Sequence, residues 1–294
     1  MGRRKLDGVL LLDKPVGPSS SAVLQAVKRL LNADKAGHAG TLDPLASGLL
    51  PLLFGEATKF AQHGLEAAKE YVAEVRLGAA TDTGDAEGAV IEQRPVAVDE
   101  STLARALAGF QGEIRQVPPM YSALKKDGRP LYELARAGQT VEREARLVTI
   151  HEMELVSRSE NLLRLRIRCS KGTYVRQLAA DLGLALGTVA HLAALRRTAV
   201  AGLRLDQAVT LDDLQALSEA ARLAWLLPAD RLLEHLPRVD LEAPQAGHFL
   251  NGQAVRLPGV AQGPVRVYQA GALLGVGESG PEGKLHPARL IARA

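Results

Sequence analysis

The stretch from Gly37 to Gly48, GHAGTLDPLASG, holds the clearest candidates for chemistry in this sequence of 294 residues. It contains one carboxylate, Asp43, and one imidazole, His38, among three glycines and a proline. Glycine adopts backbone conformations closed to other residues and proline fixes φ, so this composition predicts a shaped loop. A carboxylate placed by such a loop could serve as a nucleophile or a base, or could merely bond its own backbone in a turn.

The segments on either side must position this loop. The apolar run 9–12 ends at Asp13-Lys14-Pro15 and predicts a buried strand, as does the apolar run 49–55. Serines at 19–21 offer an N-cap for a helix that continues at helical spacing to Leu31. Lys14 is either a solvated turn lysine or a support for the loop, and the residues alone favour neither.

Alternation from Tyr71 to Leu77 predicts a strand in which Tyr71 begins the buried face. Its ring would then pack in the core or line a cleft. A polar turn, Thr81-Asp82-Thr83-Gly84-Asp85, follows and predicts a hairpin. Asp-Thr-Gly also occurs in aspartic proteases, where two such loops share a proton, but this chain has one copy. A dimer could supply the second copy, so a protease that uses Asp82 is a weak alternative.

Arginines alternate with apolar residues from Leu163 to Cys169, which predicts a strand with one basic face. Between Arg158 and Arg176 there are six basic residues and one acidic residue. This face is either solvated or a surface for phosphates. Next comes Ser-Lys-Gly-Thr-Tyr-Val-Arg, in which Thr173 could cap a helix. Tyr174 and Arg176 lie off that helix's apolar stripe.

Composition excludes several classes of protein. A single cysteine rules out an intrachain disulfide and a cysteine zinc cluster. A net charge of +3 and a pI near 9.0 permit an anionic partner without demanding one. The first apolar run is too short for a signal peptide, and no run approaches a membrane span. We therefore expect a cytoplasmic protein. No phosphate-cradling GxxxxGK[ST] motif is present, and we expect neither a metal nor a cofactor.

Five ordered motifs resemble the TruB family of tRNA pseudouridine synthases. They are the loop 37–48, Leu-Asp-Lys-Pro at 12–15, Lys-Glu-Tyr at 69–71, Ser-Lys-Gly-Thr-Tyr-Val-Arg at 170–176 and His-Leu-Ala-Ala-Leu-Arg-Arg at 191–197. The loop follows the family pattern Gly-His-x-Gly-x-Leu-Asp-Pro-x-Ala-x-Gly at every fixed position. A match of this length with fixed His, Asp and Gly positions is specific.

The resemblance implies the α+β pseudouridine synthase fold, with a mixed, mainly antiparallel central sheet flanked by helices and loops. It implies a catalytic domain over residues 1–236, with a thumb-like RNA-binding insert at about 118–146. Beyond Pro237, short apolar runs between Gly and Pro turn signals predict a small β-barrel. This barrel, at 237–294, resembles the PUA-like domain that ends many RNA-modifying enzymes.

The resemblance also implies an isomerase that converts uridine-55 in the T-loop of tRNA to pseudouridine after flipping the base out. Its site residues map onto seven positions. They are Asp43 as the catalytic carboxylate, Arg176 as its partner, Tyr71 stacked on the base, Tyr174 and Leu195 at the target nucleotide, His38 in the gap left by the base, and Lys14 at the substrate or beneath the loop. A tRNA T-arm is the expected partner. We expect a monomer that needs no guide RNA and no membrane.

Pseudouridylation exchanges an N1–C1′ bond for a C5–C1′ bond within one nucleotide, so it needs no redox cofactor or ATP. A carboxylate beside the sugar could attack the sugar, attack the ring or remove a sugar proton, and the sequence leaves these open. A nearby arginine favours the ionised carboxylate. The other class of function is an RNA-binding chaperone that folds tRNA without turnover.

Overall fold

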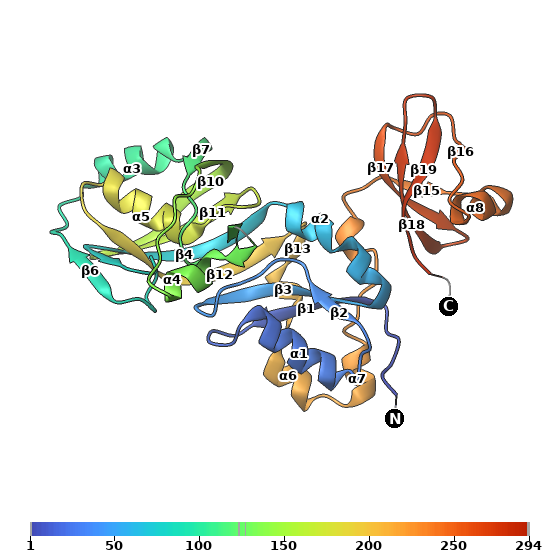
Figure 1. The fold of residues 1–294 in the computed structure, drawn as a ribbon, viewed down its shortest axis with the longest axis horizontal. Helices are drawn as coiled ribbons and strands as arrows, with labels where there is room; N and C mark the ends of the chain where they lie inside the picture. The colour runs from blue at the N-terminus through green and yellow to red at the C-terminus, as the bar shows by residue number, and fades with distance from the viewer. Residues whose placement is uncertain (1, 123, 127, 293–294) are drawn as a thin grey trace.

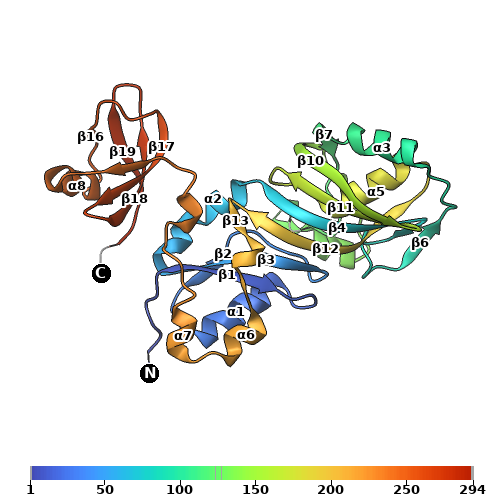
Figure 2. The same ribbon diagram turned by 180° about the vertical axis from the view of Figure 1, so that it is seen from behind.

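The computed structural model describes residues 2–122, 124–126 and 128–292, in which a mixed sheet and a smaller C-terminal sheet dominate (Figures 1 and 2). The large sheet has the order β14 (Val209–Thr210), β1 (Gly8–Lys14), β3 (Ala46–Phe54), β12 (Ala190–Val200), β4 (Lys69–Leu77), β11 (Leu162–Cys169), β10 (Arg146–Ser159) and β7 (Gly112–Gln116). β2 (Ala36–His38) also pairs with β3, and β13 (Leu203–Arg204) with β12. Within the described part of the large sheet, only the β1–β14 and β3–β12 pairs are parallel, which confirms the predicted mixed, mainly antiparallel sheet.

One half of the sheet is built on β1 and β3. Both are apolar almost throughout because both of their faces are buried. Helices α1 (Ser20–Leu30), α6 (Leu211–Ala216) and α7 (Glu219–Leu223) lie below this half in Figure 1. Ser19 caps α1 as predicted, since its side chain accepts a hydrogen bond from the Ala22 N–H at 3.2 Å. β2 and β3 pair as antiparallel strands, so residues 39–45 are the connection between them.

The other half is built on β4, β11, β10 and β7, with α3 (Glu100–Gly109) and α5 (Val175–Ala185) on one face. β5 (Ala79–Thr81) and β6 (Val90–Gln93) form the predicted polar hairpin. The arginines of β11 point to the face opposite Tyr71, because they alternate with the buried residues of that strand. There Arg166 pairs with Glu154 at 2.5 Å. Local acidic partners therefore favour the solvated alternative for this face over a phosphate surface.

Shorter elements complete the chain. β8 (Lys125–Lys126), β9 (Arg129–Pro130) and α4 (Leu131–Arg136) belong to the thumb-like segment 118–146, in which residues 123 and 127 lie outside the described residues. η1 (Gly55–Phe60) and α2 (Ala61–Glu66) follow β3, and η2 (Leu205–Gln207) follows β13. No helix of the described chain has the length and apolar character that a membrane crossing requires.

The C-terminal sheet forms a curled half-barrel that stands to one side of the large sheet in both views (Figures 1 and 2). The chain reaches it through η3 (Arg231–Leu233). Its strand order is β15 (Arg238–Asp240), β17 (Gly263–Gln269), β18 (Ala272–Ser279), β19 (Lys284–Leu290) and β16 (Val255–Arg256), with α8 (Ala243–Leu250) packed against it. Phe249 of α8 is fully buried in its core.

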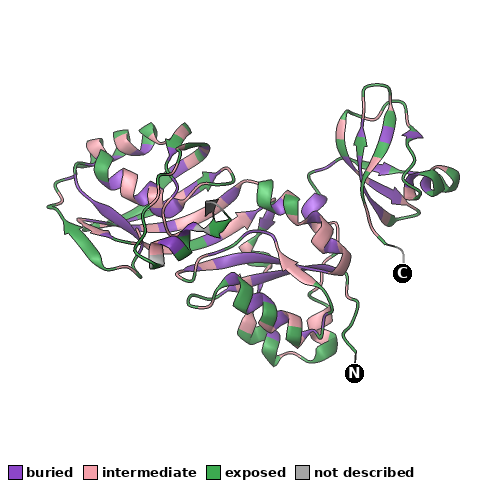
Figure 3. Cartoon of the chain, viewed as in Figure 1, coloured by how far each residue is buried: buried purple, intermediate pink, exposed green. Residues whose placement is uncertain are grey.

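Burial follows the layers, with strand interiors covered and the outer faces of α1, α3 and α5 exposed (Figure 3). The two halves of the large sheet have separate apolar cores. Tyr71 and Leu195 pack against both of them. Two predicted site residues therefore lie at the junction of the halves.

Candidate active site

A cavity of about 200 Å³ lies at this junction, beside the loop of residues 37–48. Its lining includes five of the seven predicted site residues: Asp43, Tyr71, Tyr174, Arg176 and Leu195. The remaining wall comes from Thr41, Leu42, Ser122, Thr173 and Val175. Ligand pockets for larger molecules run to roughly 300–1,000 Å³, so this cavity suits a single planar ring.

Asp43 and Arg176 form an ion pair at the cavity wall, with Oδ2 and Nη2 separated by 2.9 Å. The Arg176 side chain is 9% exposed, whereas that of Asp43 is 47% exposed. The arginine is fixed on its other sides by the carboxylate of Asp85 at 3.4 Å and by the carbonyl of Tyr121 at 2.6 Å. A rigid, buried cation thus holds an accessible carboxylate in one orientation.

The start of α5 sets the position of Arg176. The side chain of Gln116 accepts from the Tyr174 N–H at 2.8 Å and donates to the Tyr174 carbonyl at 3.1 Å. Tyr174 is the N-cap residue, and Thr173 instead donates its hydroxyl to the Ser170 carbonyl. The prediction that Thr173 caps this helix is therefore wrong, because a side chain from β7 secures the helix entry.

Two aromatic rings face the cavity. Burial raises the pKa of Tyr71, although the charge and the hydrogen bond of Arg197 oppose that shift. Burial likewise raises the pKa of Tyr174. Both side chains are therefore neutral phenols at physiological pH. Their rings offer surfaces on which a base could stack.

The loop of residues 37–48 is held from below by groups to which the motifs assigned no role. Ser20 clamps Leu42, since its hydroxyl donates to the Leu42 carbonyl at 2.9 Å and accepts from the Leu42 N–H at 2.8 Å. Arg197 donates to the Gly40 carbonyl at 3.1 Å. Asp85, noted only as part of a polar turn, is buried against Arg176. Ser20 and Arg197 bind backbone groups, and Asp85 binds a side chain distant in the sequence, so no local sequence pattern identifies these partners.

Lys14 lies beneath the loop and does not line the cavity. Its Nζ donates to the carbonyls of Ala46 at 2.7 Å and Pro15 at 2.8 Å, which matches the alternative of loop support. Burial lowers its pKa to about 8, against partial compensation by the charge of Asp43.

The shifted pKa of Lys14 predicts a pH-dependent contribution to stability. Below pH 8 the amine is protonated in both states, whereas between about pH 8 and the ordinary pKa of 10.5 only the unfolded chain holds the proton. Raising the pH through this range therefore favours the native state. We expect the free energy of unfolding of the wild type, minus that of Lys14→Met, to increase between pH 7.5 and 9.5 in urea titrations. If the free energies of unfolding of the two proteins changed in parallel with pH, the lowered pKa of Lys14 would be contradicted.

His38 ends β2 and is half-buried, but it does not line the cavity. Its Nδ1 is buried without a hydrogen-bond partner in the described part of the chain. Burial and the charge of Arg197 lower its pKa, so the imidazole is neutral at pH 7. The ring is therefore uncharged, and its enclosed Nδ1 has no partner among the described residues.

Gly48 marks the close approach of β3 to β12. A Cβ atom there would lie 2.3 Å from the Arg197 carbonyl oxygen, and φ is +101°. Gly17 has a similar φ of +107°, but a Cβ atom there would have no neighbour within 4 Å. Gly17→Ala should cost about 1–3 kcal/mol from backbone strain alone. We expect Gly48→Ala to lower the free energy of unfolding by clearly more, and equal losses in urea unfolding would refute the close approach.

Asp82 is exposed, and its carboxylate accepts from the Ala89 N–H at 2.9 Å within its own hairpin. It does not line the cavity of Asp43. The shared-proton pair that an aspartic protease needs is therefore not formed by Asp82 and Asp43. The protease alternative finds no support in this geometry.

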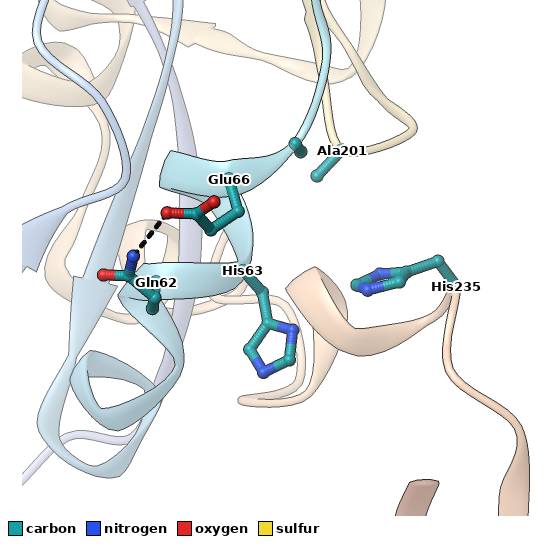
Figure 4. A pocket seen from close by; sticks show the side chains of 6 residues that line it. Gln62, His63, Glu66, Ala201 and His235 are labelled. Atoms are coloured by element: carbon teal, nitrogen blue, oxygen red, sulfur yellow. Dashed lines mark hydrogen bonds between the residues drawn. The ribbon is translucent and has the colours of Figure 1, made fainter. Parts of the chain in front are cut away.

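A larger cavity, of about 400 Å³, lies between α2 and the segment that leads to the C-terminal sheet (Figure 4). The imidazoles of His63 and His235 face each other there with centroids 5.6 Å apart. Glu66 accepts a hydrogen bond from Gln62 at 2.6 Å. Within the described residues no group of three His, Cys, Asp or Glu side chains is arranged to hold a metal ion. The groups suited to catalysis gather instead at the smaller cavity.

Family comparisons agree with the motifs. Residues 28–175 match the model of the TruB family pseudouridylate synthase N-terminal domain. Residues 176–234 match the tRNA pseudouridylate synthase B C-terminal domain, and residues 237–291 match the C-terminal model of pseudouridine synthase II TruB. Together these spans include every residue that lines the cavity beside Asp43.

Individual relatives match over nearly the full length. The chain is 57% identical over 290 residues to the tRNA pseudouridine synthase B of Aromatoleum aromaticum, covering 99% of this chain and 94% of the relative. It is 58% identical over 299 residues to that of Burkholderia mallei, covering 99% of each.

Solved structures show the same fold. A chain of a Cbf5-Nop10-Gar1 complex superimposes with a TM-score of 0.74 and 29% identity, over 98% of this chain and 84% of that one. A chain of an H/ACA RNP bound to a substrate RNA containing 2′-deoxyuridine superimposes with a TM-score of 0.74 and 27% identity. The match covers 97% of this chain and 85% of that one. These comparisons confirm the predicted fold class.

Proposed function

The chain belongs to the TruB family of pseudouridylate synthases, and we propose that it isomerises uridine-55 in the T-loop of tRNA to pseudouridine. The observation that carries the proposal is the accessible Asp43 carboxylate, 2.9 Å from the buried Arg176 guanidinium at the wall of a cavity with aromatic sides. The names of the curated relatives support tRNA as the substrate.

In the proposed reaction, Asp43 acts on the nucleotide whose base occupies the cavity. The N1–C1′ bond breaks and its electron pair stays with uracil. Asp43 promotes this cleavage by attacking the sugar, by attacking the ring or by removing a sugar proton. After the base turns, C5 bonds to C1′, the C5 proton is lost and N1 gains a proton. Arg176 holds the carboxylate in its orientation throughout.

The target base must leave the RNA stack to reach Asp43. We assign Tyr71 to stacking on it, at about 1–3 kcal/mol for one base, and Tyr174 and Leu195 to contacts with the same nucleotide. His38 would occupy the space that the base vacates. Its half-buried position beside the loop and outside the cavity is consistent with this role.

The proposed enzyme is a monomer that works on a tRNA T-arm without a guide RNA. One observation supports the role of the thumb-like segment 118–146 in this proposal. The segment reaches the site, since Ser122 lines the cavity and the Tyr121 carbonyl accepts a hydrogen bond from Arg176. We propose that this segment closes over the RNA. We also propose residues 1–236 as the catalytic domain and residues 237–294 as an RNA-binding domain.

The test is the release of tritium from a tRNA transcript labelled at C5 of uridine, with purified protein and no other RNA. We expect one equivalent of tritium per tRNA, and none from a transcript that carries cytidine at position 55. Binding without release would indicate a tRNA-folding chaperone instead. Release that survives the cytidine substitution would refute the assignment to position 55.

A further inference from the structure

Three buried cations around the catalytic loop make no ion pair with any described residue. They are Lys14, Lys69 and Arg197, with exposed fractions of 0%, 8% and 1%. Their hydrogen bonds go to backbone carbonyls. Lys14 donates to Pro15 and Ala46, Lys69 to Leu65 and Ala67, and Arg197 to Gly40, Thr41 and Leu49. Buried charges are usually paired, so this cluster is an unusual arrangement that costs stability.

Arg197 is the member of the cluster that joins the parts of the site. Its guanidinium donates to the carbonyl of Leu49 at 2.8 Å, to that of Gly40 at 3.1 Å and to that of Thr41 at 3.4 Å. These carbonyls lie on both sides of Asp43 in the sequence. Arg197 is also the register partner of Tyr71 on β4, and its charge acts on that phenol. One side chain therefore ties the Asp43 loop to the ring that faces it.

The surroundings leave the charge of Arg197 unopposed. The titratable groups that it influences are Lys14 on β1, His38 on β2, and Lys69 and Tyr71 on β4, none of which is a carboxylate. Burial lowers the pKa of each of the two lysines to about 8. Burial lowers the pKa of Arg197 too, but a guanidinium stays protonated in proteins.

We propose that Arg197 is a positioning residue of the isomerisation, which fixes the separation of Asp43 and Tyr71 and supplies positive charge beneath the base. The proposal rests on the proposed function. When the N1–C1′ bond breaks, uracil keeps the electron pair and becomes negatively charged. The guanidinium, held beside the Tyr71 ring and beneath the base, opposes that negative charge electrostatically.

The test compares Arg197→Lys and Arg197→Met in single-turnover tritium release from C5-labelled tRNA, between pH 6.5 and 9. Arg166→Met is the matched control, because Arg166 is carboxylate-paired on the opposite face of the sheet. Arg197→Met should slow the single-turnover rate about 10²–10³-fold at every pH, the size of loss seen on removing one electrostatic contact to the transition state. The Kd for tRNA, measured by filter binding, should stay within about threefold because the substitution does not touch the RNA.

Arg197→Lys distinguishes charge from packing. At pH 6.5 the introduced amine is protonated, and the rate should lie within about tenfold of the wild type. Above about pH 8 the amine should lose its proton, as Lys14 and Lys69 do, so the rate should fall toward that of Arg197→Met. The single-turnover rates of the wild type and of Arg166→Met should show no comparable fall above pH 8.

Equal losses in the two Arg197 variants at every pH would overturn the proposal, as would losses confined to tRNA affinity or to unfolding. Should Arg197→Met fail to fold, the two pH arms of Arg197→Lys decide the question within one protein. A wild type that releases no tritium would instead refute the proposed function.

Discussion

Asp43→Asn should abolish pseudouridine formation and leave tRNA binding intact. The amide has nearly the shape of the carboxylate, but it is neither a nucleophile nor a base. Loss of such a group lowers turnover by about 10⁴-fold or more. The measurement is single-turnover tritium release from C5-labelled tRNA, beside a filter-binding Kd. Since the Asp43 side chain is 47% exposed, we expect little change in the free energy of unfolding.

Asp82→Asn is the matched control for this variant. Asp82 is also a loop aspartate, but it is exposed and bonds only within its hairpin. We expect wild-type tritium release from it. Turnover by Asp43→Asn at more than a hundredth of the wild-type rate would remove Asp43 from the chemistry, as would a comparable loss in Asp82→Asn.

Arg176→Met should lose both activity and stability. Asp43 then loses the cation that orients it, and tritium release should fall about 10²–10³-fold. The buried Asp85, 4% exposed, loses its ion-pair partner as well. Breaking a buried pair in this way costs about 3–5 kcal/mol, which urea unfolding measures directly.

The double variant Arg176→Met/Asp85→Asn separates these effects. It removes the stranded charge, so most of the lost stability should return. Activity should not return, because Asp43 still lacks its partner. If activity recovered along with stability, Arg176 would serve the fold alone, and the ion pair with Asp43 would have no part in catalysis.

The local elements of the fold were predictable from sequence because each depends on short-range patterns. Local patterns predict these elements: apolar runs for β1 and β3, alternation for β4 and β11, and a serine cap for α1. The start of α5 was mispredicted, because Gln116 is separated from Tyr174 by 58 positions in the sequence and its amide secures the helix entry.

The sequence by itself determined the types of group available for chemistry and, through its motifs, the family. Asp43, Tyr71 and Arg176 can be identified from those motifs alone. Only the tertiary structure decided that Arg176 bridges two carboxylates and that Arg197 lies unpaired beneath the loop. It also decided that Lys14 and His38 lie outside the cavity. The physical reason is that these roles depend on backbone carbonyls and desolvation, which are properties of a place in the fold and not of a residue type.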